Sequence, residues 1–141
     1  MFEAETKPLN WTPDPDHGYT VARRPDGGMH YTFTSASHGT LEHWREFALQ
    51  HLLDSDRLTR NLYDLRQVKE IPPEAIQYAL ELTSDPSARN IRLATVVATP
   101  EVREAVQKIM ALSIPGGVEI GIFTDIEEAE AWLDRSLTLL V

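Results

Sequence analysis

The sequence predicts a single α/β domain built on a mixed, mostly parallel sheet. Strand-like and helix-like segments follow one another in the order β-β-α-β-α-β-α-β-α. A hairpin followed by βα repeats is typical of a mainly parallel sheet with right-handed crossovers and packed helices. Residues 91–98 are almost all apolar, as in a strand that helices cover on both faces. We therefore expect a single-layer sheet of about five strands, the first antiparallel, with about four flanking helices.

The length of 141 residues, with 42% hydrophobic and 25% charged residues, suits one globular domain held together by packing. Residues 1–17 contain three prolines and no periodicity, which predicts an irregular N-terminal arm. The α/β domain is expected over residues 18–136. Residues 137–141, LTLLV, form an apolar C-terminal tail.

The first half of the domain starts with a hairpin. Residues 18–24 and 29–35 are strand-like, and PDGG between them is a strong hairpin signal. In the second strand Met29, Tyr31 and Phe33 alternate with polar residues, which gives one apolar face. Residues 41–53 predict a helix with an apolar face and Thr40 as its N-cap. Residues 60–68 predict the third strand.

The second half repeats a strand-helix pattern with clear start signals. Pro73 opens a helix, because its missing N–H is not needed in the first turn. After the apolar strand at 91–98, Thr99 is placed as the N-cap of the next helix, with Pro100 at its first position. That helix ends before PGG, and residues 118–123 form the last strand. Asp125 and Glu128 make a D-x-x-E capping box for the final helix.

The composition excludes several classes of function. The formal net charge is −9, and lysines and arginines are scattered, so no cationic cluster for nucleic acid or anionic lipid is present. There is no cysteine, which excludes disulfides and thiolate metal sites. The first residues, MFEAETKPLNW, lack the pattern of an export signal, and no apolar run reaches the length of a membrane span. We expect a cytoplasmic protein without a cofactor.

Three segments, in this element order, resemble the STAS/SpoIIAA-like family of sulfate-transporter and anti-sigma-antagonist domains. They are LYDLRQVKEIPPEAIQYAL, IRLATVVATPEVREAVQKI and IGIFTDIEEAEAWL. The similarity covers residues 18–135 and is clearest in the closing strand, the acidic cap and the EEAEAWL helix. The resemblance implies a compact α/β domain that serves protein contacts or ligand binding and is not usually enzymatic.

The resemblance also directs attention to the start of the helix at Pro73. Anti-sigma-antagonist members carry an Asp-Ser-Ser-Gly-like corner there, in which a serine is phosphorylated as a switch. The matching residues in this sequence are Pro72, Pro73, Glu74 and Ala75, which contain no hydroxyl group. We therefore expect no phosphorylation switch at this corner.

The most polar corner of the sequence lies at residues 34–40, between the second strand and the first helix. Ser35, Ser37, His38 and Thr40 could line a ligand pocket beside the free N–H groups of the helix. The alternative is that these residues only cap the helix and turn the chain. Trp44 and other large apolar helix residues are expected mostly in the core, yet a groove between helices would accept an apolar ligand.

Catalytic and metal sites find little support. Ser37, His38 and Asp64 can be combined into a triad, but the sequence has no G-x-S-x-G motif. His38, His43 and His51 are the only clustered histidines, and their spacing matches no metal-binding motif. The leading hypothesis is thus a non-enzymatic, STAS-like module that binds a partner protein or a small amphiphilic ligand. The competing hypothesis is a small hydrolase-like enzyme that uses the Ser37/His38 loop.

The apolar tail predicts a homodimer. Residues 137–141 include Leu137, Leu139, Leu140 and Val141, and burial of each leucine is worth about 1.5–3 kcal/mol. Two-fold dimers are the commonest assembly, although the tail could also pack on its own domain. Light scattering at roughly tens of micromolar should give the mass of a dimer, and deletion of residues 137–141 should reduce it. A monomeric full-length protein contradicts the prediction.

Overall fold

The structure is a computed structural model that describes residues 18–25, 28–53, 59–84, 91–112 and 118–135. The predicted arm at residues 1–17 and the tail at residues 137–141 lie outside these ranges, as do residues 26–27 of the hairpin turn. The predictions made for the arm and the tail therefore stay predictions.

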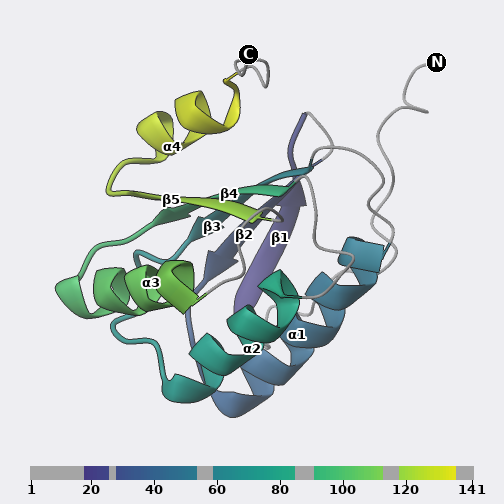
Figure 1. Cartoon of the computed structure of the whole chain (residues 1–141), viewed down its shortest axis with the longest axis vertical. Helices are drawn as coiled ribbons and strands as arrows, with labels where there is room; N and C mark the ends of the chain where they lie inside the picture. Colours follow the sequence, from purple (N-terminus) through teal and green to yellow (C-terminus); the bar gives the residue numbers. More distant parts are fainter. Residues whose placement is uncertain (1–17, 26–27, 54–58, 85–90, 113–117, 136–141) are drawn as a thin grey trace.

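The described chain forms a five-stranded sheet with flanking helices, which confirms the predicted fold class (Figure 1). The strands are β1 (Tyr19–Arg23), β2 (Met29–Phe33), β3 (Thr59–Asp64), β4 (Ile91–Val96) and β5 (Val118–Phe123). The helices are α1 (His38–Leu53), α2 (Pro73–Thr83), α3 (Pro100–Leu112) and α4 (Ile126–Leu133). The strands lie in the order β1-β2-β3-β4-β5; β1 is antiparallel to β2, and the other pairs are parallel.

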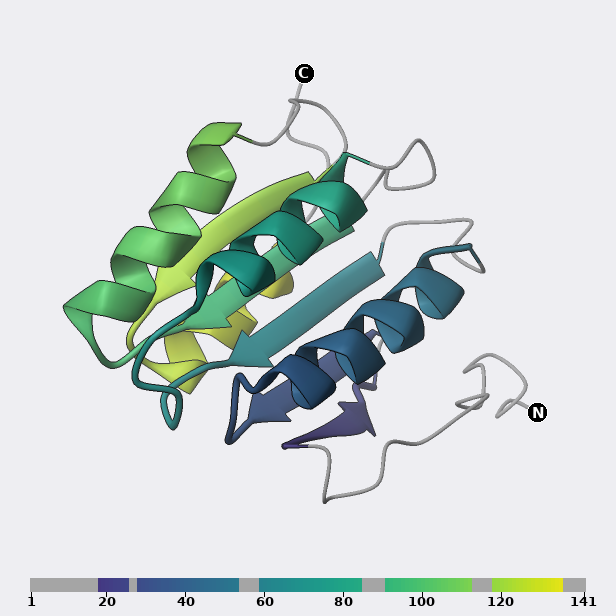
Figure 2. The same ribbon diagram turned by 90° about the horizontal axis from the view of Figure 1, so that it is seen from below.

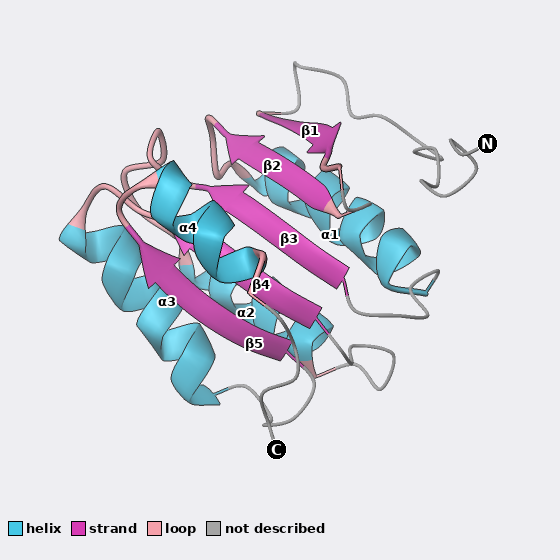
Figure 3. Cartoon of the chain, turned by 90° about the horizontal axis from the view of Figure 1, so that it is seen from above, coloured by secondary structure: helices cyan, strands magenta, loops and turns pink. Residues whose placement is uncertain are grey.

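This strand order places three helices on one face of the sheet. The crossovers through α1, α2 and α3 all step in the same direction, so crossovers of one hand bring these helices to the same side. Figure 2 shows the three helices side by side over one face. The opposite face carries α4, which lies over β3, β4 and β5 (Figure 3).

Two apolar layers follow from the alternation of side chains along the strands. The layer beneath α1, α2 and α3 is rich in aromatic residues, among them Tyr19, Tyr31, Phe33, Trp44 and Phe47. The layer beneath α4 is made of smaller side chains, namely Leu62, Ala94, Val96, Ala129 and Leu133. The central strands thus bury both faces, as the apolar run at residues 91–98 predicted.

Several boundaries differ from the sequence prediction, and at two of them a side-chain oxygen bonds to the backbone. Helix α1 begins at His38 rather than at Leu41, and the assignment of Thr40 as its N-cap is wrong. The carbonyl of Ser37 accepts from the N–H of Leu41 at 2.9 Å, and its hydroxyl accepts from the N–H of Thr40 at 3.4 Å.

The third strand also ends earlier than predicted, at Asp64 instead of residue 68. Oδ1 of Asp64 accepts from the backbone N–H of Arg66 at 3.1 Å and turns the chain. The strand predicted over residues 91–98 likewise ends at Val96.

The other predicted helix starts are confirmed. Pro73 occupies the first turn of α2. The hydroxyl of Thr99 accepts from the N–H of Val102 at 3.2 Å at the start of α3. Oδ1 of Asp125 accepts from the N–H of Glu127 at 2.8 Å and caps α4. These caps satisfy N–H groups that have no partner inside the helix.

Two arginines from the sheet hold the C-terminal end of α4. Nη1 of Arg92 donates to the carbonyl oxygens of Leu133 at 3.3 Å and Arg135 at 2.7 Å, and Nε of Arg60 donates to that of Leu133 at 2.6 Å. Arg92 is 4% exposed and also bonds Glu119 at 3.2 Å. Because the last carbonyls of a helix lack partners and carry its negative dipole end, these cations fix α4 on the sheet.

The strands beneath α4 carry small residues at the points of closest approach. Ala94 is fully buried there. A Cβ on Gly121 would lie 2.8 Å from Cε2 of Phe123 and 3.2 Å from Cη2 of Trp132. The missing side chain of Gly121 therefore leaves room for Trp132 to pack against β5.

Replacement of Arg92 by Met should destabilise the protein by about 3 kcal/mol, because buried carbonyls and Glu119 lose a charged donor. The control is Arg135→Met, since Arg135 also lies over Trp132 and contacts Glu119 but is about half exposed. That change should cost less than about 1 kcal/mol. Urea unfolding followed by circular dichroism measures both values, and equal losses would contradict the assigned role of Arg92.

Candidate functional site

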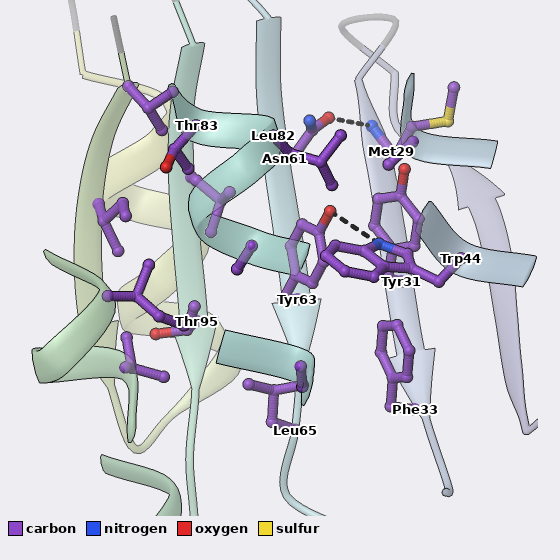
Figure 4. A pocket seen from close by; sticks show the side chains of 18 of the residues that line it. Met29, Tyr31, Phe33, Trp44, Asn61, Tyr63, Leu65, Leu82, Thr83 and Thr95 are labelled. Carbon is purple, nitrogen blue, oxygen red and sulfur yellow. Dashed lines mark hydrogen bonds between the residues drawn. The ribbon is translucent and has the colours of Figure 1, made fainter. Parts of the chain in front are cut away.

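A cavity of about 220 Å³ lies between the sheet and the layer formed by α1, α2 and α3. Every strand contributes to its floor through the residues that face these helices. The cavity brings together side chains from segments that lie far apart in the sequence. Figure 4 shows these side chains converging from the strands and from the helices above them.

Aromatic rings form one wall of the cavity. The rings of Tyr31 and Tyr63, on neighbouring strands, stack with centroids 4.4 Å apart. Phe33 stacks with Tyr63 at 6.2 Å, and Trp44 of α1 meets Tyr63 edge-on at 6.1 Å. These large rings hold α1 away from the strands, so that the space beside them is not filled by backbone.

The polar atoms of this wall remain uncharged. Nε1 of Trp44 donates to the hydroxyl of Tyr63 at 3.2 Å. Burial raises the pKa of Tyr63 to about 12. Burial also raises the pKa of Tyr31 well above its ordinary value. Both phenols therefore stay neutral at physiological pH, and the wall presents an apolar surface with two hydroxyl groups.

Small residues on α2 leave the space that the cavity occupies. Ala75 and Ala79 lie one helical turn apart and both line the cavity. Ala48 of α1 lines it as well. Longer side chains at these three positions would extend toward the sheet, so the small size of the three alanines keeps the cavity open.

The two ends of the cavity differ in polarity. One end, where β3 begins and β1 ends, carries Arg23, Thr59, Asn61 and Thr83, whereas Leu65, Val68 and Ile71 line the other end. In Figure 4 Asn61 and Thr83 lie toward the first end and Leu65 toward the second. Oδ1 of Asn61 accepts from the backbone N–H of Met29 at 3.0 Å. Burial lowers the pKa of the Arg23 guanidinium, because this end is poorly hydrated.

Of the five residues predicted as a ligand site, Trp44 lines the cavity. The other four, Ser35, Ser37, His38 and Thr40, lie outside it. The hydroxyl of Ser37 is 2.8 Å from that of Thr40, and both belong to the helix start. The hydroxyl of Ser35 accepts from the N–H of Ser37 at 3.1 Å. In the described structure these hydroxyls bond within the corner, which favours the capping alternative for them.

His38 connects this corner to the start of α2. Its Nδ1 bonds Oε2 of Glu74, and its Nε2 lies 3.1 Å from Oε2 of Glu42. The hydroxyl of Tyr78 donates to the same oxygen of Glu74 at 3.2 Å. The corner at residues 72–75, which lacks a hydroxyl, thus joins two helices through Glu74.

The residues of the hypothetical triad have other partners. Ser37 bonds Thr40, His38 bonds Glu74, and Oδ2 of Asp64 accepts from Nη2 of Arg66 at 2.9 Å. Nδ1 of His43 lies 2.9 Å from the hydroxyl of Tyr19. No group of three or more histidine and acidic side chains that could hold a metal ion occurs within the described residues. The side chain of His51 lies outside the described residues.

Sequence reasoning did not find the polar residues of the cavity. Asn61 and Arg23 lie on strands, where period-two alternation assigns them to one face but does not say what covers it. The signal that could have found Asn61 is the series Asn61, Tyr63, Leu65, which alternates onto a single face. Tyr31 belongs to the apolar face that the sequence predicted for the second strand.

A solved structure places this arrangement among known folds. An uncharacterised protein of the DUF3478 family from Shewanella loihica PV-4, described as having a SpoIIAA-like fold, superposes with a TM-score of 0.60. The match covers 82% of this chain and 94% of that one, at 19% sequence identity. The chain has a SpoIIAA-like fold. This confirms the resemblance at the level of the fold.

The sequence comparisons add no further assignment to this SpoIIAA-like domain. No family model matches the sequence, and no curated protein matches it. Within the described residues, none of the helices combines the length and the apolar character needed to span a bilayer.

The bond between His38 and Glu74 should make the stability of this SpoIIAA-like domain depend on pH. The hydrogen bond with Glu74, followed by the charge of Glu42, raises the pKa of His38. A raised pKa in the folded state means that the contribution is complete below about pH 6.5 and is lost as the pH rises through the folded-state pKa. The stability advantage of the unmodified protein over Glu74→Gln should therefore shrink between about pH 6 and pH 9.

The matched control is Glu81→Gln, because Glu81 pairs with Arg45, whose Nη2 lies 2.7 Å away. Arginine does not titrate in this range, so the effect of that change should stay level across the same pH series. Urea unfolding at each pH measures both differences. A constant difference for Glu74→Gln would show that His38 does not supply the contact.

Proposed function

We propose that this SpoIIAA-like domain is a non-enzymatic module that binds a small, largely apolar ligand between its sheet and helices α1, α2 and α3. It does so without the phosphorylatable serine of anti-sigma antagonists, because residues 72–75 contain no hydroxyl. The observation that supports the proposal is the cavity of about 220 Å³ with its aromatic wall.

The energetic cost of the cavity supports a role in binding. Empty apolar space costs about 24 cal/mol per Å³, so a dry cavity of this size would cost about 5 kcal/mol. The total stability of a small domain is only about 5–15 kcal/mol. Methylene groups of a ligand would recover much of this cost, since they restore the dispersion contacts that the lining side chains lack.

The size of the cavity limits the ligand. An engineered apolar cavity of about 150 Å³ takes up benzene, whereas pockets for drug-sized molecules measure about 300–1,000 Å³. At about 220 Å³ the cavity lies between these values. A single ring with a short substituent or a short alkyl chain fits this range, and a two-chain lipid does not.

Among the functions considered, the cavity favours ligand binding. A partner protein would need an exposed recognition surface, and the cavity instead lies beneath the helices. The hydrolase alternative uses Ser37 and His38, whose hydrogen bonds lead to Thr40 and Glu74. The cavity therefore supports ligand binding and supports neither of the two alternatives.

Filling the cavity should abolish binding of 1-octanol, a short amphiphile that we choose as the probe. Isothermal titration calorimetry on the unmodified protein should show saturable binding with a negative heat-capacity change, the mark of apolar burial. Ala79→Phe should weaken the affinity at least about tenfold, because the ring would occupy part of the cavity that Ala79 lines.

The control for this experiment is Gln77→Phe, which adds the same ring on the exposed face of α2. Its affinity for 1-octanol should match that of the unmodified protein. Absence of saturable binding to the unmodified protein, or equal binding by Ala79→Phe, contradicts the proposed function.

A further inference from the structure

We propose that the ligand is an amphipathic monocarboxylate whose carboxylate lies at the Arg23 and Asn61 end of the cavity and whose apolar part points toward Leu65. This inference rests on the proposed function and adds the chemical class of the ligand. It is carried by the polarity and geometry of one end of the cavity.

The charge of the lining residues indicates an anion. Among the described residues that line the cavity, Arg23 is the only one with an ionised side chain. A charged guanidinium donates stronger hydrogen bonds than a neutral group, so Arg23 can donate to a ligand carboxylate beside another partner. One cation at the end of an otherwise neutral cavity matches a ligand with one negative charge.

The position of Asn61 supplies a second donor. A backbone N–H can only donate, so the bond from the N–H of Met29 fixes the side-chain oxygen of Asn61 toward Met29. The amide NH2 group of Asn61 is then the part that remains for a ligand. Asn61 lines the cavity, and in Figure 4 its oxygen points toward Met29 while its NH2 nitrogen points away from Met29.

The sheet register brings the two donors to the same level. Arg23 of β1 is the cross-strand partner of Met29 on β2, and Met29 bonds Asn61 on β3. Arg23 and Asn61 therefore flank Met29 from either side. A carboxylate at this level would bond to the guanidinium of Arg23, and it would bond to the NH2 group of Asn61 on the side of the amide that points away from Met29.

The rest of the cavity suits an apolar chain. From Asn61 to Leu65 the strand direction spans four residues, or about 13 Å. Tyr63, Leu65, Ala75 and Ala79 line the cavity along this path, and Val68 and Ile71 line its far end. A short alkyl or aryl group attached to the carboxylate would follow the strands toward that end.

The overall charge makes a local cation necessary. The chain carries a formal net charge of −9, which repels anions at long range. Screening in physiological salt limits this repulsion to about 8 Å, so a cation inside the cavity decides the affinity of an anion that has entered. Selectivity for a carboxylate over a neutral head group should therefore depend on Arg23.

The test compares octanoate with 1-octanol, which share an alkyl chain and differ in head-group charge. Calorimetry on the full chain should show octanoate binding about tenfold more tightly, as expected for charge-assisted hydrogen bonds. Arg23→Gln should abolish this preference, so that the ratio of the two affinities falls to about one. The control Arg24→Gln changes the next residue, whose Nη2 pairs with Asp134 at 3.2 Å, and should keep the preference.

Asn61→Asp provides an independent variant, because a carboxylate oxygen can still accept from the N–H of Met29. The added negative charge should lower the affinity for octanoate at least about tenfold relative to that for 1-octanol. This variant decides the question where Arg23→Gln fails to fold.

The outcomes separate the two proposals. Saturable binding of 1-octanol with no preference for octanoate overturns the carboxylate inference and leaves the proposed function standing. A preference that survives both Arg23→Gln and Asn61→Asp also overturns the inference. If neither compound binds, both proposals are wrong.

Discussion

The sequential order of the strands constrains every other part of this molecule. Because crossovers of one hand step across the sheet in one direction, α1, α2 and α3 must share a face. The second face is left to α4, a helix of eight residues that is too short to be stable alone. The buried guanidinium of Arg92, with that of Arg60, binds the carbonyls at its end and thereby completes the second layer.

The two layers are packed by opposite means, and the cavity results from this difference. Beneath α4 the strands present Ala94 and Gly121, so the helix approaches the sheet closely. On the other face Tyr31, Tyr63 and Trp44 hold α1 at a distance. Alanines on α2 do not fill the space that remains. Large rings next to small residues therefore produce a cavity in a core that is otherwise closely packed.

The sequence was sufficient where short-range rules decide the structure. The starts of three helices were predictable, since each depends on a few neighbouring residues. They are marked by Pro73 at the first position of α2, by the cap Thr99 of α3 and by the cap Asp125 of α4. The start of α1 was not, because Ser37 and Thr40 are both good caps and their hydroxyls bond each other. Choosing between them requires the position of the preceding strand.

The candidate site was harder to predict, for a physical reason. Polar residues in a loop, such as Ser37 and His38, attract attention in a sequence, yet here their hydrogen bonds serve the ends of helices. The cavity is formed by residues that look like ordinary strand and core positions. Only Trp44 was recognised, because its size made it notable on a helix.

The indole of Trp44 also has a consequence for observing this protein in solution. Trp44 lies in the cavity wall, whereas Trp132 belongs to the opposite layer, where the guanidinium groups of Arg92 and Arg135 lie over its ring at 5.6 and 5.3 Å. Because Trp44 donates a hydrogen bond to Tyr63, the emission of Trp44 depends on the polarity of the cavity wall. Trp44 and Trp132, two of the three tryptophans of the chain, therefore lie on opposite sides of the sheet, and variants that keep only one of them would report on each side separately without an added label.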